Sequence, residues 1–214
     1  WPDFSTALKA LHSPQNSEVP SISSPARLRL AYDELLANQL ALSLVRGHMK
    51  RAAGRSFAGD GTRQAKIIGA LPYKLTGGQA FANAEIHADM TSPSRMLRLL
   101  QGDVGSGKTI VALLALATAV ECGAQGTFMV PTEILARQHL ASLTPLCAAA
   151  GIAIAVLTGR EKGKQREDIL ERLAAGRIDI LIGTHALFQE GVEFRNLGLV
   201  VIDEQHRFGV HQRL

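Results

Sequence analysis

The sequence predicts an α/β protein, in which a mostly parallel sheet is covered by helices on both faces and preceded by a helical connector. Three observations lead to this fold class. From residue 96 onward, short apolar runs of strand length alternate with helical patterns. A glycine-rich loop joins the first of these runs to a strongly apolar helix. Ahead of this region, a stretch dense in Ser and Pro separates two helical patterns.

The composition is that of an ordinary globular chain with a core: of 214 residues, 46% are hydrophobic and 20% are charged. The net charge of +4 permits nucleic-acid binding without arguing for it. Cys122 and Cys147 lack metal-ligand spacing, so we expect free thiols in a reducing cytosol. The chain starts without a signal-peptide pattern, and its longest apolar run is too short to span a bilayer. We therefore expect a cytoplasmic protein without a membrane partner.

Residues 1–70 are predicted to form the helical connector. A short helix is expected within residues 1–11, and a Ser- and Pro-rich linker follows it. Apolar residues then recur at three- and four-residue steps, which predicts a long amphipathic helix over about 27–51. Residues 52–70 break this pattern with several glycines, and we expect them to be loose.

Residues 71–214 are predicted to form a second unit built from βαβ elements. Thr76 is a candidate N-cap for a helix over 78–90. The alternation that follows predicts a parallel sheet between helices. The expected strands are 96–101, 127–130, 152–157, 178–182 and 197–202. The expected helices are 108–122, a helix that Thr132 caps, Pro145 interrupts and Gly151 ends, and 164–175.

Residues 102–109 fit the phosphate-binding pattern G-x-x-x-x-G-K-T without a mismatch. The backbone N–H groups of such a loop and the start of the following helix point at one anion. Lys108 is placed to reach the β- and γ-phosphates of a nucleoside triphosphate, and the Thr109 hydroxyl is placed to ligate Mg²⁺. A chance match in a glycine-rich turn is the alternative. The candidate loop residues are Gly102, Asp103, Val104, Gly105, Ser106, Gly107, Lys108 and Thr109.

A second half of the site is expected where the last apolar run ends. Asp203 follows this run directly and is placed to hold Mg²⁺. Glu204 comes next and is placed to orient and deprotonate an attacking water. The alternative is a strand followed by an acidic helix start, where carboxylates interact favourably with the helix dipole. Because a complete phosphate loop lies upstream, we prefer the catalytic interpretation.

Four strings occur in the order found in DExH-type superfamily 2 helicases, and as a set they resemble the RecG family of ATP-dependent branched-DNA helicases. The strings are 100–109, 131–139, 183–189 and 203–210, the last of which begins Asp203-Glu204-Gln205-His206. The helix predicted over about 27–51 also resembles the segment before the motor in that family. The likeness covers nearly the whole chain. It implies the N-terminal RecA-like helicase domain, truncated after motif II.

The resemblance implies further roles for single residues. Gln79 matches a glutamine that contacts adenine, with an exposed helix glutamine as the alternative. His206 matches a motif II histidine that couples the γ-phosphate to the neighbouring domain. The positions that match DNA-contacting motifs, where side chains meet the phosphate backbone, are Thr132, Arg137, Thr184 and His185. For Arg137, a solvated helix face stays the alternative.

The function implied by the resemblance is ATP hydrolysis, with Mg²⁺, that drives motion along duplex DNA and remodels replication forks and Holliday junctions in the bacterial cytoplasm. The sequence holds neither the second RecA-like domain nor the wedge domain of such helicases. We therefore expect a monomeric internal fragment that binds nucleotide weakly and shows negligible turnover alone. A non-catalytic nucleotide- or DNA-binding module stays open, as does the motor of a related transcription-repair coupling translocase. The Asp-Glu-Gln-His string and the preceding helix favour the RecG family over that translocase.

Overall fold

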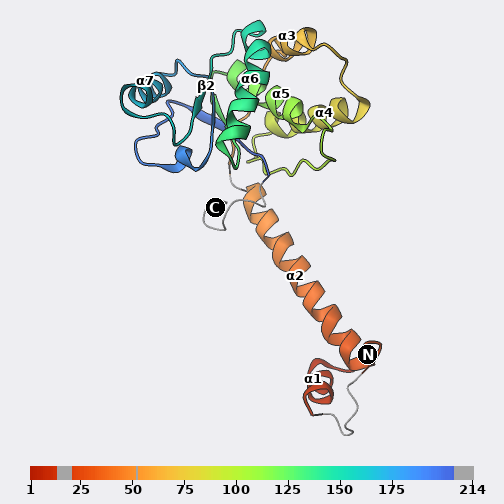
Figure 1. Ribbon diagram of the computed structural model, residues 1–214. Coiled ribbons are helices and arrows are strands. Elements are labelled where there is room, and N and C mark those ends of the chain that lie inside the picture. The colour runs from red at the N-terminus through yellow and green to blue at the C-terminus, as the bar shows by residue number, and fades with distance from the viewer. Residues whose placement is uncertain (14–20, 52, 205–214) are drawn as a thin grey trace. The chain divides into compact units, whose positions relative to one another are not determined.

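The structure is a computed structural model that describes residues 1–13, 21–51 and 53–204. It divides into two compact units, Trp1–Ala53 and Gly54–Leu214. Among the described residues, the first unit is built of helices and the second contains the sheet (Figure 1).

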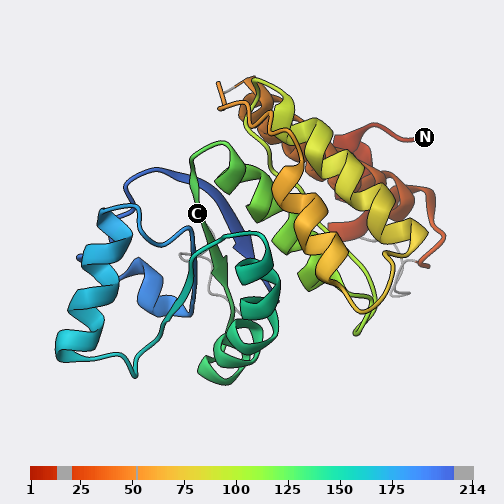
Figure 2. The same cartoon turned by 90° about the horizontal axis from the view of Figure 1, so that it is seen from above.

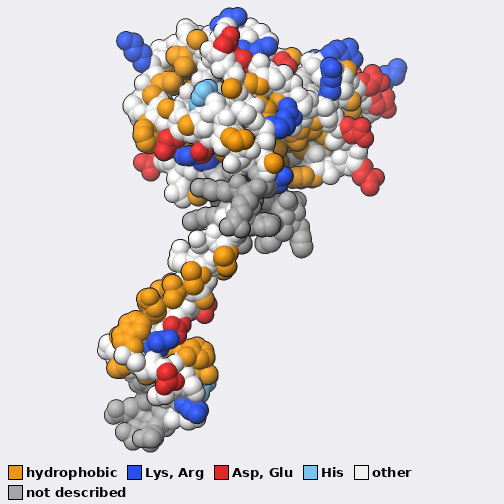
Figure 3. Space-filling model, turned by 180° about the vertical axis from the view of Figure 1, so that it is seen from behind, with side chains coloured by type: hydrophobic (Ala, Val, Ile, Leu, Met, Phe, Trp, Pro, Cys, Tyr) orange, Lys and Arg blue, Asp and Glu red, His pale blue; other side chains and the backbone are white. Residues whose placement is uncertain are grey.

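The first unit holds helix α1, Phe4–His12, and the long helix α2, Pro25–Arg51. Asp3 caps α1, because its carboxylate accepts the N–H of Thr6 at 2.9 Å. The edge of the Trp1 ring meets Tyr32 at a centroid distance of 5.0 Å. Both predicted helices are confirmed. Apolar side chains stand along the outside of α2 (Figure 3), and the most exposed leucines among them are Leu35, Leu40 and Leu44.

The second unit is organised around a parallel sheet with the strand order β2-β3-β1-β4. Its strands are β1 Gln125–Met129, β2 Ile154–Leu157, β3 Ile180–Gly183 and β4 Leu197–Ile202. In register, Thr127 of the central strand lies beside Leu181 on one side and Val200 on the other. The predicted parallel sheet is confirmed.

Helices cover both faces of this sheet, as Figure 2 shows from above. One face packs against α3 Thr62–Ala70, α4 Gly77–Thr91, α5 Lys108–Glu121 and α6 Glu133–Ala149, directly or through α5. The other face packs against α7 Gly163–Ala174 and the short 3₁₀ helix η1 His185–Phe188. Because side chains alternate along a strand, Phe128 belongs to the first core and Met129 to the second.

Residues 54–70 differ from the loose segment that the sequence predicts. They contain helix α3, whose Ile67 is fully buried, and Phe57 is buried ahead of it. The Glu121 carboxylate accepts the N–H groups of Gly61 and Arg63 at 2.8 Å each, so it caps α3 from a distant helix. No local pattern reveals a cap that is supplied from so far along the chain.

The segment 96–101 is wrong as a predicted strand, because it forms no ladder with any described strand. Met96 and Leu100 pack against the core, whereas Leu97 and Leu99 are exposed. This alternation is typical of an extended chain, but a strand also requires a neighbour for its backbone groups. Within the described residues, β4 pairs with β1 alone and offers its other edge to no strand.

Pro145 does not interrupt its helix, since α6 runs without a break from Glu133 to Ala149. Proline removes one backbone N–H from the helix, at a local cost. Leu143 and Cys147 on either side of it are buried in the core and hold the helix in place. Cys122 and Cys147 are free thiols, as expected, and burial raises the pKa of Cys147 to about 12.

Candidate functional site

The phosphate loop lies between the extended segment 96–101 and the first turn of α5. Gly105 and Gly107 have φ angles of +82° and +78°, which favour glycine. A Cβ on Gly107 would collide with the Gln79 side chain, and one on Gly102 would lie 2.8 Å from Ser106 Oγ. The loop is therefore tight at Gly102 and Gly107, where a neighbouring side chain occupies the space that a Cβ would need.

Lys108 is the first residue of α5, and its ammonium group folds back over the loop. Its Nζ donates to the carbonyl oxygens of Gly102 and Asp103 at 2.8 Å each. These bonds hold the cation at the loop and at the start of α5, where a helix N-terminus favours an anion such as phosphate. Thr109 follows in the same first turn and is half-buried.

Gln79 contacts the phosphate loop from α4. Thr76 caps this helix in a capping box, in which the Gln79 side chain accepts the Thr76 N–H at 3.0 Å. The other end of the same amide donates to Ser106 O at 2.8 Å. The structure thus brings this sequence-predicted residue to the nucleotide loop, although both ends of its amide are engaged by the protein.

Asp203 lies at the carboxyl end of β4, where its N–H donates to Met129 O at 2.8 Å. Its pKa is lowered, first by His139 and then by the N–H of Glu204, while burial opposes the shift; the charge of Lys108 also lowers it. The hydroxyl of Thr109 and the oxygens of Asp203 are the donors that Mg²⁺ prefers.

Glu204 has a φ of +49°, an uncommon conformation for a side chain other than glycine. Its N–H donates to Asp203 Oδ1 at 2.9 Å, so the backbone turns sharply at the two carboxylates. Such local strain is found preferentially at functional sites. His206, the fourth predicted catalytic residue, lies outside the described residues.

The predicted DNA-contacting residues follow β1 and β3, and parallel strands place them at the same edge as Asp203. Thr132 caps α6, and its hydroxyl accepts the N–H of Leu135 at 3.3 Å. His185 is exposed. Thr184 is buried, and within the described chain its hydroxyl has no hydrogen-bond partner.

Arg137 is engaged within the protein. Its guanidinium donates to Glu161 at 2.5 Å, and Glu161 is almost completely buried. The other oxygen of Glu161 accepts the N–H and the hydroxyl of Thr158 at 2.6 and 2.7 Å. Arg137 therefore fixes the loop after β2, while its side chain stays partly exposed.

A second carboxylate supports the same loop. Glu133, in the first turn of α6, accepts the N–H of Gly159 at 3.1 Å and lies 3.0 Å from Nε of Arg160. Two carboxylates thus hold the residues between Thr158 and Glu161. No local pattern in the sequence pairs these carboxylates with the residues that they hold.

One residue beside Asp203 that the sequence does not reveal is His139. It lies on α6 with Nε2 3.6 Å from Asp203 Oδ2, and its ring packs against Phe128 at a centroid distance of 5.0 Å. It ends the string 131–139 that resembles a DNA-contacting motif. Sequence position gives no indication that a residue of this string reaches the carboxylate of another.

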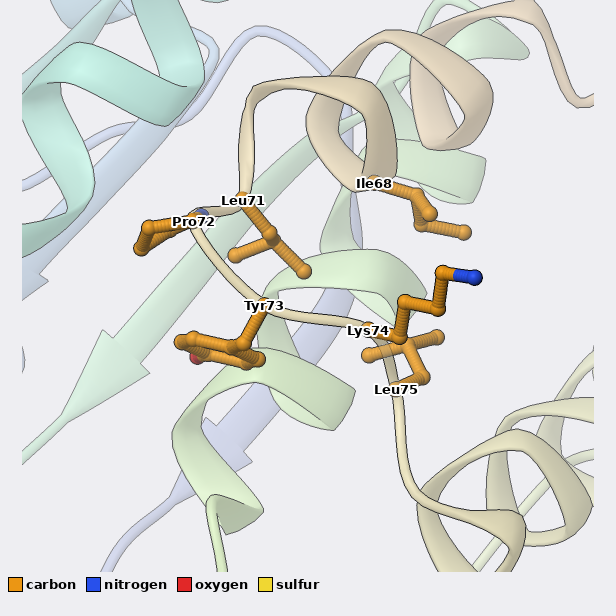
Figure 4. Close-up of a pocket in the computed structure, with 6 residues that line it drawn as sticks. All are labelled: Ile68, Leu71, Pro72, Tyr73, Lys74 and Leu75. Carbon is orange, nitrogen blue, oxygen red and sulfur yellow. The ribbon is translucent and has the colours of Figure 1, made fainter.

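A separate pocket of about 360 Å³ opens beside α3 and the chain that leads to α4 (Figure 4). Its lining residues are Ile68, Leu71, Pro72, Tyr73, Lys74 and Leu75, and none of them is a sequence-predicted site residue. Across the part of the chain that the structure describes, no helix combines the length and apolarity needed to cross a membrane.

Comparison with known proteins shows what this chain is similar to. Residues 78–213 match the family model of the DEAD/DEAH box helicases. The ATP-dependent DNA helicase RecG of Bacillus subtilis (strain 168) is 50% identical over 213 residues, which are 99% of this chain and 31% of that protein. RecG of Escherichia coli (strain K12) is 46% identical over 212 residues, 97% of this chain and 31% of that protein.

A solved structure of RecG bound to a three-way DNA junction has a TM-score of 0.78 and 48% identity; the match covers 86% of this chain and 25% of that one. This likeness confirms the predicted RecA-like fold. The chain spans about a third of the length of the curated relatives it matches, at 31% of each. The chain belongs to the DEAD/DEAH box helicase family.

Proposed function

We propose that this chain is the ATP-binding part of a DNA helicase motor that acts on branched DNA. The observation that supports it most is the phosphate loop at the start of α5, where Lys108 Nζ folds back to Gly102 O and Asp103 O at 2.8 Å each. Asp203, at the end of β4, adds a carboxylate for a metal ion, and hydrolysis of a nucleoside triphosphate requires both a cation for the phosphates and such a carboxylate.

The chemistry follows from the donors at the sheet edge. The loop N–H groups and Lys108 bind the phosphates, and Gln79 meets the adenine. Thr109 and Asp203 hold Mg²⁺, which neutralises the charge that develops on the phosphates. Glu204 orients the attacking water and takes its proton.

DNA binding is proposed for the same carboxyl edge of the sheet. Thr132 and His185 supply a hydroxyl and an imidazole there, which suit contacts to phosphate oxygens without reading sequence. Arg137 holds the loop after β2 through Glu161, and Thr184 is buried after β3. Branched DNA as the substrate is proposed because a relative with 48% identity is seen on a three-way junction. We further propose that the protein is a monomer in the bacterial cytoplasm, and that this part works together with a second RecA-like domain and a wedge domain.

The test is the binding of a fluorescent ATP analogue with Mg²⁺, for the wild type, Lys108→Ala and the control Lys164→Ala. Lys164 is exposed on α7 and has the same charge. We expect Lys108→Ala to weaken binding about tenfold or more, because it removes a charge-assisted hydrogen bond to phosphate. The control should match the wild type. Equal binding by Lys108→Ala would contradict the site, while binding without turnover agrees with a motor that needs its second domain.

A further inference from the structure

His139 is held firmly beside the metal-binding carboxylate. Its ring packs on Phe128 of β1 with an interplanar angle of 43°, and its side chain is only 15% exposed. Nε2 points at Asp203, 3.6 Å from Oδ2. Within the described residues, this buried nitrogen has no hydrogen-bond partner.

The distance is just too long for a hydrogen bond. A shortening of roughly 0.5 Å would bring Nε2 and Oδ2 into the range of an N–H···O bond. A buried donor left without a partner is unfavourable, so forming this bond is favoured. An imidazole can donate from Nε2 whether it is neutral or protonated, so the contact needs no change of charge.

Helix α6 connects the contact between His139 and Asp203 to Thr132, the residue proposed to meet DNA. Thr132 caps the helix, and His139 lies two turns further along it. Between them Ala136 is buried in the core, and beyond them so are Leu143 and Cys147. The two residues therefore belong to one rigid element, and a displacement at one end of it is transmitted to the other.

We propose that His139 is a positioning residue that donates from Nε2 to Asp203, orients this carboxylate for Mg²⁺ and links it to the helix whose start meets DNA. The inference rests on the proposed function, since it gives Asp203 the role of a metal ligand. Groups that hydrogen-bond a ligating carboxylate fix its orientation, and losing one typically costs 10- to 100-fold in metal affinity.

The experiment measures how much Mg²⁺ the 214-residue chain needs to bind a fluorescent ATP analogue, compared with binding in EDTA. His139→Leu removes the donor and keeps an apolar contact with Phe128. His139→Gln keeps an N–H at a similar reach, and His139→Asn has an amide that falls short. Gln138→Ala, at the exposed neighbour, is the matched control.

We expect the Mg²⁺ midpoint of His139→Leu to rise about tenfold, while His139→Gln and Gln138→Ala stay near the wild type and binding in EDTA is unchanged. If His139→Leu fails to fold, the Mg²⁺ midpoints of His139→Asn and His139→Gln are compared instead, and the midpoint of His139→Asn should be the higher. Unchanged midpoints, or an equal loss in EDTA, would overturn the role of His139 alone. A wild type that binds no nucleotide would overturn the proposed function, and this inference with it.

Discussion

At the scale of single residues, Glu161 is the buried carboxylate whose environment the structure defines best. Burial alone would raise its pKa, but hydrogen bonds from Thr158 and Arg137 outweigh burial, and the pKa is lowered. A carboxyl group with a lowered pKa in the folded state contributes stability above its unfolded pKa of about 4.3. That contribution is lost as the pH falls through the folded pKa.

The Glu161→Gln variant should therefore be less stable than the wild type by about 2 kcal/mol at pH 6.5, because it removes a charged acceptor of buried hydrogen bonds. The difference should narrow when both are unfolded in urea at pH 3.5, because this pH lies below the unfolded pKa of about 4.3 and the stability contributed by the carboxylate is then being lost. Glu171→Gln, on the exposed face of α7, controls for the loss of one negative charge. A difference that stays constant with pH would contradict the assignment.

Single residues also show where sequence reasoning succeeds and where it ends. The sequence was sufficient to place Asp203 close to the loop residues. The strings 102–109 and 203–204 each follow an apolar run predicted as a strand, and the carboxyl ends of parallel strands lie at the same edge of a sheet. His139 and Glu161 could not be placed. Their partners, Asp203 and Arg137, lie far along the chain, and the pairs form only when the helices pack.

At the scale of elements, strands were predictable where apolar runs gain neighbours in the sheet. β1 to β4 lie within or close to their predicted ranges, whereas 96–101 has the same apolar character and forms no ladder. The apolar residues of a segment indicate that it is buried, but whether it forms a strand depends on a neighbouring strand that pairs with it. In the same way, the pattern around Pro145 did not reveal that core contacts of α6 would outweigh one lost hydrogen bond.

Helix α4 shows how an element presents a site residue. We expect Thr76→Ala to destabilise the chain by about 1 kcal/mol in urea unfolding, since it removes the side-chain cap and one side of the capping box. Thr144→Ala is the matched control, because this threonine is exposed on α6 and bonds only to a carbonyl of its own helix. The control should change stability by less than about 0.5 kcal/mol. If both substitutions lowered the stability equally, the capping box would not stabilise the chain more than an ordinary side-chain hydrogen bond does.

At the scale of the whole molecule, the core belongs to the second unit. Both core clusters lie between Phe57 and Ile202, and neither includes any of the side chains of α1 and α2 that the structure describes. The compact unit starts at Gly54, whereas the sequence suggests a boundary at residue 71. The segment between them contributes Phe57 and Ile67 to the first cluster, and Gln64 donates to Leu114 O and Thr118 Oγ1 of α5 at 3.1 and 2.6 Å.

Two truncated chains, one starting at residue 54 and one at residue 71, would show which of these residues begins the stable unit. We expect residues 54–214 to unfold at nearly the same urea concentration as the full 214 residues, because the deletion removes no residue of either cluster. Residues 71–214 should lose at least about 4 kcal/mol or fail to fold, since removing a single buried large side chain already costs about 2–5 kcal/mol. The loss also uncovers α5 directly behind the phosphate loop, so binding of the ATP analogue should fall with it. Equal stability of the two truncated chains would instead favour the boundary at 71, with α3 as an attached but dispensable helix.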